Sequence, residues 1–161
     1  MMIKRMVCAL CAVMLSLSLC ACGEKTKSID MQALENSMVS ADKSLPEMKV
    51  SGSWDENAEK AFSYISDLEY NKIHGFFLAY AADGMAYEIA VVQLKDKSDA
   101  SAMADSLREH VRSRVQMYKT YEPQQMQRAE SAVVKTDGDC VLLIMSDAPQ
   151  NAETAFKEFT K

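Results

Sequence analysis

Residues 76–94 read FFLAYAADGMAYEIAVVQL, and they carry the strongest signal for the fold of the chain. Asp83-Gly84 divides it into two β-prone runs, and Asp-Gly is a favoured sequence for a two-residue hairpin turn. In the second run, apolar side chains occupy both sets of alternating positions, which is typical of a strand covered on both faces. The stretch therefore predicts a β-hairpin whose second strand lies inside a covered sheet.

A second hairpin is predicted at residues 132–145, AVVKTDGDCVLLIM, with its turn at Asp137-Gly138. A helix follows each hairpin, the first over about residues 99–118 and the last from near Pro149. This repeated order reflects either an old duplication or, as we favour, convergence on a common tight turn. The chain is predicted to be α+β: two β-hairpins form a small antiparallel sheet packed against helices, a ββα–ββα-like core with N-terminal helices.

Shorter helices are expected elsewhere in the chain. The first runs from about Asp30 until Pro46 ends it. Residues 49–53 carry no clear signal, but Ser53 and Glu56 have the spacing of a capping box at the start of another helix. A brief helix is expected to begin at Pro123.

Helical spacing also predicts which side chains are buried. Asp147 is expected to cap the last helix. The predicted buried face of that helix consists of Ala152, Ala155, Phe156 and Phe159. The predicted buried face of the long helix consists of Ala100, Met103, Ala104, Leu107, Val111, Val115 and Tyr118.

The N-terminus has the pattern of a secretion signal. Lys4 and Arg5 precede an uncharged apolar run at residues 6–19, which is shorter than the roughly 20 residues of a membrane-spanning helix. The sequence LCACG at residues 19–23 resembles the bacterial lipobox. That resemblance implies that Cys22 becomes the first residue of the mature protein and carries a diacylglycerol on its sulfur. The alternatives are a plain secretion signal and an uncleaved anchor.

The domain organisation follows from this interpretation. Residues 1–21 are predicted to be a removed lipoprotein signal peptide, residues 22–29 a lipidated tether, and residues 30–161 a single domain. The predicted location is the cell membrane, with the protein lipid-anchored and facing outside the cytoplasm. Its predicted partner is the lipid bilayer, contacted through the Cys22 lipid. The formal charge of −5 argues against nucleic acid as a partner.

Most of the cysteines are accounted for by the signal peptide. Removal of residues 1–21 and lipidation of Cys22 leave only Cys140 as a free thiol, so no intramolecular disulfide is expected. Cys140 lies in an apolar strand, where a cysteine is usually a small buried hydrophobe. A reactive nucleophile is the less favoured alternative.

Several motifs, in this order and spacing, resemble domain-of-unknown-function family 4358, a family of small bacterial lipoproteins. They are EIAVV (88–92), LKD (94–96), YEP (121–123), AESAVV (129–134), GDCVLLI (138–144) and Asp147. The resemblance implies a lipid-anchored extracytoplasmic domain of unknown biochemical function. It supplies no catalytic residues.

The sequence offers little chemistry for an enzyme or a metal centre. His74 and His110 lie on different predicted elements, and neither has a Cys or His companion at ligand spacing, whereas zinc needs three or four ligands. The chain contains no Gly-x-Ser-x-Gly elbow, phosphate loop or dinucleotide fingerprint. We therefore predict no metal, no cofactor, no catalytic residues and no enzyme activity.

Three residues remain as candidates for a binding face. Glu88 is a carboxylate amid apolar residues and is interpreted as structural; a cleft containing a second polar group would favour an enzyme. Arg108 and Arg112, together with His110, Arg114 and Lys119 on the same helix, could form a patch for an acidic partner or an anionic wall polymer. A solvated helix face is favoured, because Asp105 and Glu109 can pair with Arg108 and Arg112 at three-residue spacing.

The function hypothesis is a membrane-tethered accessory or binding module for an unknown envelope protein or ligand. The alternatives are a small envelope enzyme that uses Glu88 and a purely structural envelope component.

Overall fold

The computed structural model describes residues 28–161. Within them the chain forms a five-stranded sheet of order β1-β2-β3-β5-β4, in which all neighbouring strands are antiparallel. The strands are β1 (Met48–Gly52), β2 (Ile73–Ala81), β3 (Glu88–Leu94), β4 (Val133–Asp137) and β5 (Cys140–Met145). The helices are α2 (Met31–Ala41), α3 (Ala58–Phe62), α4 (Ala100–Tyr121), α5 (Pro123–Glu130) and α6 (Pro149–Phe159), with 3-10 turns at Tyr70–Lys72 and Lys97–Asp99. The predicted α+β fold is confirmed.

The predicted signal peptide and Cys22 lie outside the described residues, as does most of the predicted tether. The part of the chain that the structure describes contains no helix both long and apolar enough to span a bilayer.

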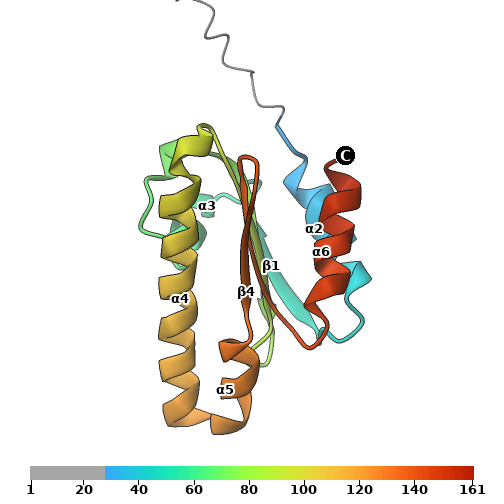
Figure 1. Ribbon diagram of the computed structural model, residues 1–161, viewed down its shortest axis with the longest axis vertical. Helices are drawn as coiled ribbons and strands as arrows, with labels where there is room; N and C mark the ends of the chain where they lie inside the picture. Colours follow the sequence, from blue (N-terminus) through green and yellow to red (C-terminus); the bar gives the residue numbers. More distant parts are fainter. Residues whose placement is uncertain (1–27) are drawn as a thin grey trace, which may run out of the picture.

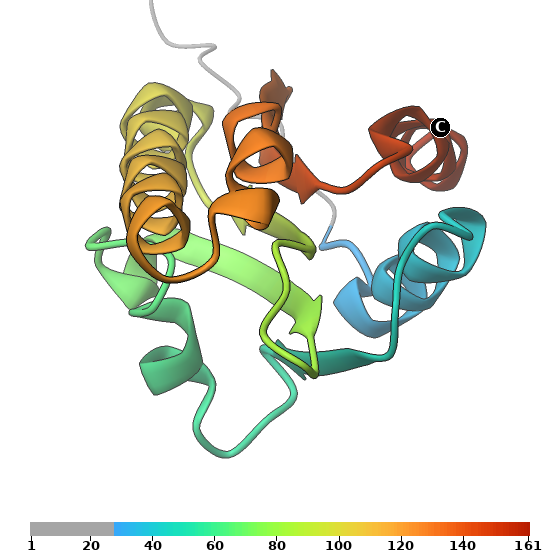
Figure 2. The same ribbon diagram turned by 90° about the horizontal axis from the view of Figure 1, so that it is seen from below.

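Helices cover both faces of the sheet. α2 and α6 pack side by side on one face, while α3 and α4 lie on the other and α5 packs against α4 (Figures 1 and 2). Each face has its own cluster of buried apolar side chains. This layering explains why strands in the middle of the sheet carry apolar side chains on both faces.

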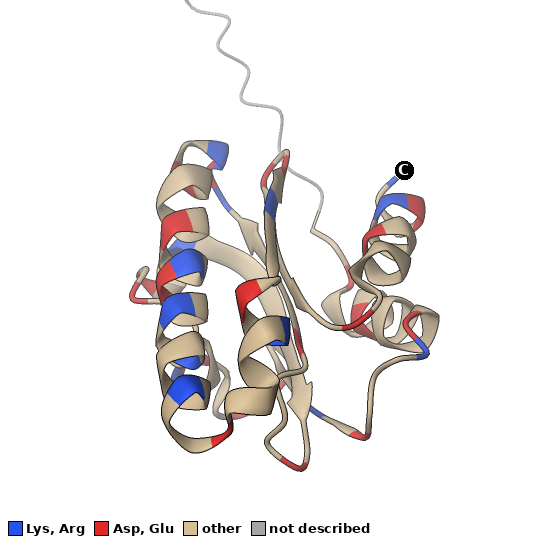
Figure 3. Ribbon diagram, turned by 60° about the horizontal axis from the view of Figure 1, so that its bottom comes forward, with Lys and Arg blue, Asp and Glu red and all other residues tan. Residues whose placement is uncertain are grey.

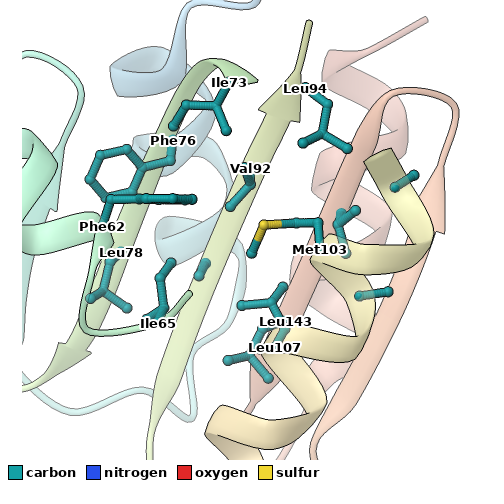
Figure 4. Close-up of a cluster of buried hydrophobic side chains, with 14 of the residues drawn as sticks. Phe62, Ile65, Ile73, Phe76, Leu78, Val92, Leu94, Met103, Leu107 and Leu143 are labelled. Carbon is teal, nitrogen blue, oxygen red and sulfur yellow. The ribbon is translucent and has the colours of Figure 1, made fainter. Parts of the chain in front are cut away.

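Strand β3 is the centre of the sheet, and all of its residues are buried. Val92 faces α3 and α4, together with Phe76 and Leu143 (Figure 4). Ala90 belongs to the same cluster. The intervening side chains of β3 join the cluster beneath α2 and α6. Burial of a large apolar side chain contributes roughly 1.5–3 kcal/mol, so the two faces together hold β3 in place. The prediction of an inner strand is confirmed.

The β2–β3 connection differs from the predicted two-residue turn, because it spans residues 82–87. Asp83 and Gly84 lie inside this loop, where the Asp83 carboxylate accepts a hydrogen bond from Met85 N at 3.0 Å and Gly84 has a φ of +84°. The Ala86 N–H donates to Gln125 Oε1 at 3.2 Å. Gly84 N donates to the Ala81 carbonyl at 3.2 Å, and Ala81 N donates to the Tyr87 carbonyl at 3.0 Å. The connection is therefore a longer loop that contains a β-turn at residues 81–84 and is linked to α5.

The second hairpin is confirmed, with a shift of one residue in its turn. Asp137 pairs with Cys140, so the two turn residues are Gly138 and Asp139. Gly138 has a φ of +60°, which a glycine adopts without the steric cost that a side chain would add. A glycine at the first turn position suits one of the two favoured hairpin turns.

The structure around β1 also differs from the sequence prediction. The segment without a clear signal forms an edge strand, and Ser53 does not cap a helix, because its Oγ accepts a hydrogen bond from Phe76 N at 2.7 Å. α3 begins only at Ala58, with no side-chain cap. α2 begins as predicted, since Asp30 accepts a hydrogen bond from Ala33 N. It ends at Ala41, before Pro46, because the chain turns extended at Asp42.

At the other end of the chain, Asp147 is not the cap of α6. Ala148 occupies that position, and Asp147 binds Arg128 instead. Phe159 is 40 % exposed rather than buried, at the last residue of α6. On α4, Ala100, Met103, Ala104, Leu107 and Tyr118 are buried as predicted, whereas Val111 and Val115 are only half-buried.

Candidate functional site

Glu88 is a buried carboxylate on the α4 side of the sheet. It is the first residue of β3 and shares its alternation with Ala90 and Val92, which point into the cluster beneath α4. Its side chain is 4 % exposed. A carboxylate removed from water needs polar or charged partners, because burial without them is costly.

Two side chains of α4 supply these partners. His110 Nε2 lies 2.7 Å from Glu88 Oε1, and Arg114 Nε lies 3.8 Å from Glu88 Oε2. Residues four apart in a helix lie on the same face one turn apart, so both side chains reach the same strand end. The structure therefore places a carboxylate, an imidazole and a guanidinium together.

Tyr118 extends the cluster by one further turn of α4. Arg114 Nη2 donates to Tyr118 Oη at 2.6 Å, and Tyr118 Oη donates to the Gly84 carbonyl at 2.9 Å. Burial raises the pKa of the Tyr118 hydroxyl above its ordinary value, although Arg114 opposes the shift. The protonated hydroxyl links the cluster to the loop at residues 82–87.

Arg114 is left with unused hydrogen-bond donors. Among the described residues, its buried Nε has no hydrogen-bond partner, and its Nη1 reaches only the Met117 sulfur at 4.0 Å. A guanidinium has five N–H donors. Two of the three Arg114 nitrogens, Nε and Nη1, therefore make no hydrogen bond to an oxygen within the described residues.

A cavity of about 350 Å³ opens over this cluster. Its polar residues are Glu88, His110, Arg114 and, from β1, Ser51. Apolar walls come from α3, the segment after it and β2: Ala61, Ile65 and Leu78. Two exposed tyrosines, Tyr64 and Tyr80, complete the lining. The arrangement suits a small ligand with an apolar face and a polar edge.

Arg108 and Arg112 lie elsewhere on α4 and are not among the residues that line this cavity. Arg108 pairs with Asp105 at 2.8 Å, and Arg112 Nε donates to Glu109 at 2.9 Å. Figure 3 shows Lys and Arg residues interleaved with Asp and Glu along the helix. The structure thus combines Glu88 with His110 and Arg114 rather than with Arg108 and Arg112.

The sequence contained a partial signal for the site. His110, Arg114 and Tyr118 recur at intervals of four, which places them on one helix face. Their relation to Glu88 depends on how α4 lies across β3, which local periodicity does not specify. The two cavity tyrosines gave no signal, since they lie on separate elements.

A second polar cluster is built around Asp147. Arg128 donates to both carboxylate oxygens, at 2.7 Å and 3.1 Å, and the Tyr87 hydroxyl donates to Oδ2 at 2.8 Å. The guanidinium also lies 3.9 Å from the centre of the Tyr87 ring. The hydrogen bond from Arg128 is the main cause that holds the pKa of Asp147 below its ordinary value. These groups satisfy one another and tie α5 to the end of β5.

The other chemical candidates lie apart from Glu88. Cys140 is buried at the end of β5 that lies farther from Glu88, and burial raises the pKa of its thiol to about 12. His74 is exposed on β2. Across residues 28–161, no three His, Cys, Asp or Glu side chains gather in a group suited to a metal ion.

The fold and the site define a small α+β domain with a charged cluster at the base of a cavity. The chain belongs to the family described as "Domain of unknown function (DUF4358)", whose model matches residues 48–146. The match covers the whole sheet and includes Glu88, His110 and Arg114, while α2 and α6 lie outside it. No curated protein matches the chain, and no solved structure matches it.

Proposed function

We propose that this chain is a lipid-anchored extracytoplasmic binding module, and that its ligand occupies the cavity over Glu88. The lipobox-like sequence at residues 19–23 supports the anchor. The observation that carries the binding role is the cavity itself, which is lined by the Glu88 carboxylate together with His110 and Arg114.

A structural role alone accounts poorly for this cluster. Charged groups lose hydration when they are buried, and apolar side chains of similar size often stabilise a protein equally well or better. The Arg114 Nε also lacks a hydrogen-bond acceptor within the described residues. Incomplete hydrogen bonding beside a cavity is the arrangement expected where a ligand completes the site.

The position of the N-terminal segment supports a membrane-facing and a ligand-facing end. Ile29 N donates to Gln93 Oε1, and Gln93 Nε2 donates to Asp139 Oδ2, both at 2.9 Å. The first described residues thus meet the sheet where β3 ends and β4 turns into β5 (Figure 1). Glu88 lies at the opposite end of β3, about 20 Å away at roughly 3.3 Å per residue. The described part of the chain therefore begins at the end of the sheet away from Glu88.

Anchoring is tested with Cys22→Ser, and with Cys20→Ser as the matched control. Wild type and the Cys20→Ser variant are expected in the membrane fraction, with a diacylglycerol mass on an N-terminal Cys22. The Cys22→Ser variant is expected to lose the lipid mass and its normal location. An unmodified Cys22, or a mature protein that starts at another residue, contradicts the anchor.

Ligand binding is tested with Ser51→Trp, which places a large side chain at the cavity from edge strand β1. Val50→Trp is the control, because Val50 is exposed on the opposite face of the same strand and does not line the cavity. Protein purified from envelopes is denatured, and released small molecules are identified by mass spectrometry. A molecule released from wild type and Val50→Trp but not from Ser51→Trp supports the proposal. Equal release from all three contradicts it.

The Glu88–His110 pair also favours a second candidate, an envelope enzyme. A carboxylate bonded to one ring nitrogen orients an imidazole so that the other nitrogen can act as a general base. A panel of p-nitrophenyl esters and glycosides distinguishes the two functions. The binding module gives no turnover above that of His110→Gln, whereas turnover lost in that variant supports the enzyme.

A further inference from the structure

We propose that the ligand of the Glu88 cavity is an uncharged pyranose sugar, whose hydroxyls bind the charged cluster and whose C–H face lies against the tyrosines. This inference rests on the proposed binding function and names its ligand class. It follows from the charge, the hydrogen-bonding groups and the apolar walls of the cavity.

The charge of the cluster disfavours an ionic ligand. The Glu88 carboxylate already faces a guanidinium and an imidazole, at 3.8 Å and 2.7 Å. A cation entering the cavity would meet Arg114 and His110, and an anion would meet Glu88. An ionic ligand would also lose its hydration on entering the cavity, which costs free energy. A neutral ligand avoids this desolvation cost.

The hydrogen-bonding groups require a ligand that both donates and accepts. The Glu88 carboxylate only accepts, while the Arg114 guanidinium only donates and has donors in excess. A hydroxyl group does both, and neighbouring hydroxyls present two such groups along one edge. Charge-assisted hydrogen bonds to carboxylate and guanidinium are stronger than neutral ones, so a polyhydroxylated edge fits the base of this cavity.

The remaining walls require an apolar face on the same molecule. Ala61, Ile65 and Leu78 offer no hydrogen bonds from their side chains. Tyr64 is 67 % exposed and Tyr80 37 % exposed, and tyrosine provides a large amphipathic contact surface at low entropic cost. A linear polyol lacks an apolar face, and an alkyl chain lacks the hydroxyls. A pyranose ring has both.

The size of the cavity limits how much of a glycan it holds. Ligand cavities usually measure about 300–1,000 Å³, so a volume of about 350 Å³ lies at the small end. We therefore infer that the site binds one or two rings, either as a free sugar or as the end of a glycan chain.

The proposal is tested by calorimetric titration of the full lipidated protein in a sugar-free detergent. The probes are methyl β-glucopyranoside, diacetylchitobiose and a longer chito-oligosaccharide, with hexanoate and hexylammonium as charged apolar probes. At least one sugar is expected to bind with a millimolar Kd, and neither ion is expected to bind. Equal affinity for diacetylchitobiose and the longer chito-oligosaccharide supports a site for one or two rings, and clearly tighter binding of the longer one contradicts that size limit.

Variants assign the binding to the cavity. Tyr80→Ala is expected to weaken sugar binding about tenfold, or about 1.4 kcal/mol, while its circular dichroism spectrum stays that of the folded wild type. Tyr121→Ala is the matched control, because Tyr121 is 79 % exposed and does not line the cavity. Sugar binding that Tyr80→Ala leaves unchanged contradicts the inference.

The failure of this inference is distinct from the failure of the proposed function. Saturable binding of hexanoate or hexylammonium, abolished by Ser51→Trp, overturns the sugar and retains the ligand cavity. Absence of binding by every sugar probe overturns the ligand class proposed here. If the purified protein also releases no molecule that depends on Ser51, the proposed function fails as well.

Discussion

The Glu88 carboxylate lies 2.7 Å from the His110 imidazole, so the start of the central strand is joined to the middle of the longest helix. This contact links residues 22 positions apart in the sequence. It also places the charged cluster at the base of a cavity, which gives the domain a site as well as a fold.

Removing the imidazole should expose the energetic coupling within this pair. His110→Leu leaves a buried carboxylate oxygen without its hydrogen bond and is expected to destabilise the fold by about 1–3 kcal/mol. The double variant Glu88→Leu, His110→Leu should cost less than the sum of the two single changes, because contacting residues are not additive. Chemical denaturation measures all three free energies of unfolding.

His74→Leu is the matched control for this cycle, since His74 is exposed on β2. It should change stability by less than about 0.5 kcal/mol. Additive effects of the Glu88 and His110 substitutions would contradict a direct energetic link between them.

The two faces of α4 should respond differently to substitution. Leu107 is fully buried, so Leu107→Ala is expected to cost about 2–5 kcal/mol through lost contacts and a cavity. Arg108 and Arg112 form exposed pairs, which contribute about 0–1 kcal/mol each. The double variant Arg108→Glu, Arg112→Glu should therefore fold with a nearly unchanged melting temperature. A large loss of stability in the double variant would show that this face is packed.

Glu35 should make stability depend on pH. Burial raises the pKa of this carboxyl above its ordinary value, so the folded state holds the proton more tightly than the unfolded chain does. Wild-type stability therefore falls as the pH rises through the raised pKa. The protein has its full stability with respect to Glu35 only below about pH 4, where this carboxyl is protonated in both the folded and the unfolded state. Glu35→Gln should raise the melting temperature at neutral pH, with a gain that disappears under acidic conditions.

Glu59→Gln serves as the control, because Glu59 is exposed on α3. Its melting curve should follow that of wild type throughout. A gain from Glu35→Gln that is equal at acidic and neutral pH would exclude ionisation of Glu35 as the cause.

The Cys140 thiol should be inert in the folded protein. It is buried, and its pKa of about 12 leaves very little thiolate at neutral pH. A thiol-specific reagent is expected to react with Cys140 only after denaturation, and reductant should not change the melting temperature. Thr136→Cys, on the neighbouring strand, should react without denaturant because Thr136 is exposed. Rapid reaction of native Cys140 would contradict its burial.

The central strand was predictable because its signal is local. Apolar residues in both alternations of β3 directly reflect helices on both faces of the sheet. The tight turn at Gly138 was also predictable to within one residue, since only the backbone geometry of a few residues determines it. Asp83-Gly84 has the same sequence pattern but lies in a longer loop, in which Ala86 N donates to Gln125 of α5.

Long-range contacts were the part that the sequence did not reveal. Ser53 has the local pattern of a helix cap, yet its hydroxyl bonds to Phe76 in the neighbouring strand. Asp147 likewise binds Arg128 instead of capping α6. The cavity over Glu88 also depends on long-range contacts, because its lining comes from β1, β2, β3, α3 and α4 together.

A crystal structure of the protein purified from its native envelope tests the ligand cavity most directly. Electron density for a small non-protein molecule is expected in the cavity, in contact with the Tyr80 ring and the Glu88 carboxylate, with Arg114 donating to it. A cavity filled only by water, or closed by Tyr64 and Tyr80, would contradict the claim that this site binds a ligand.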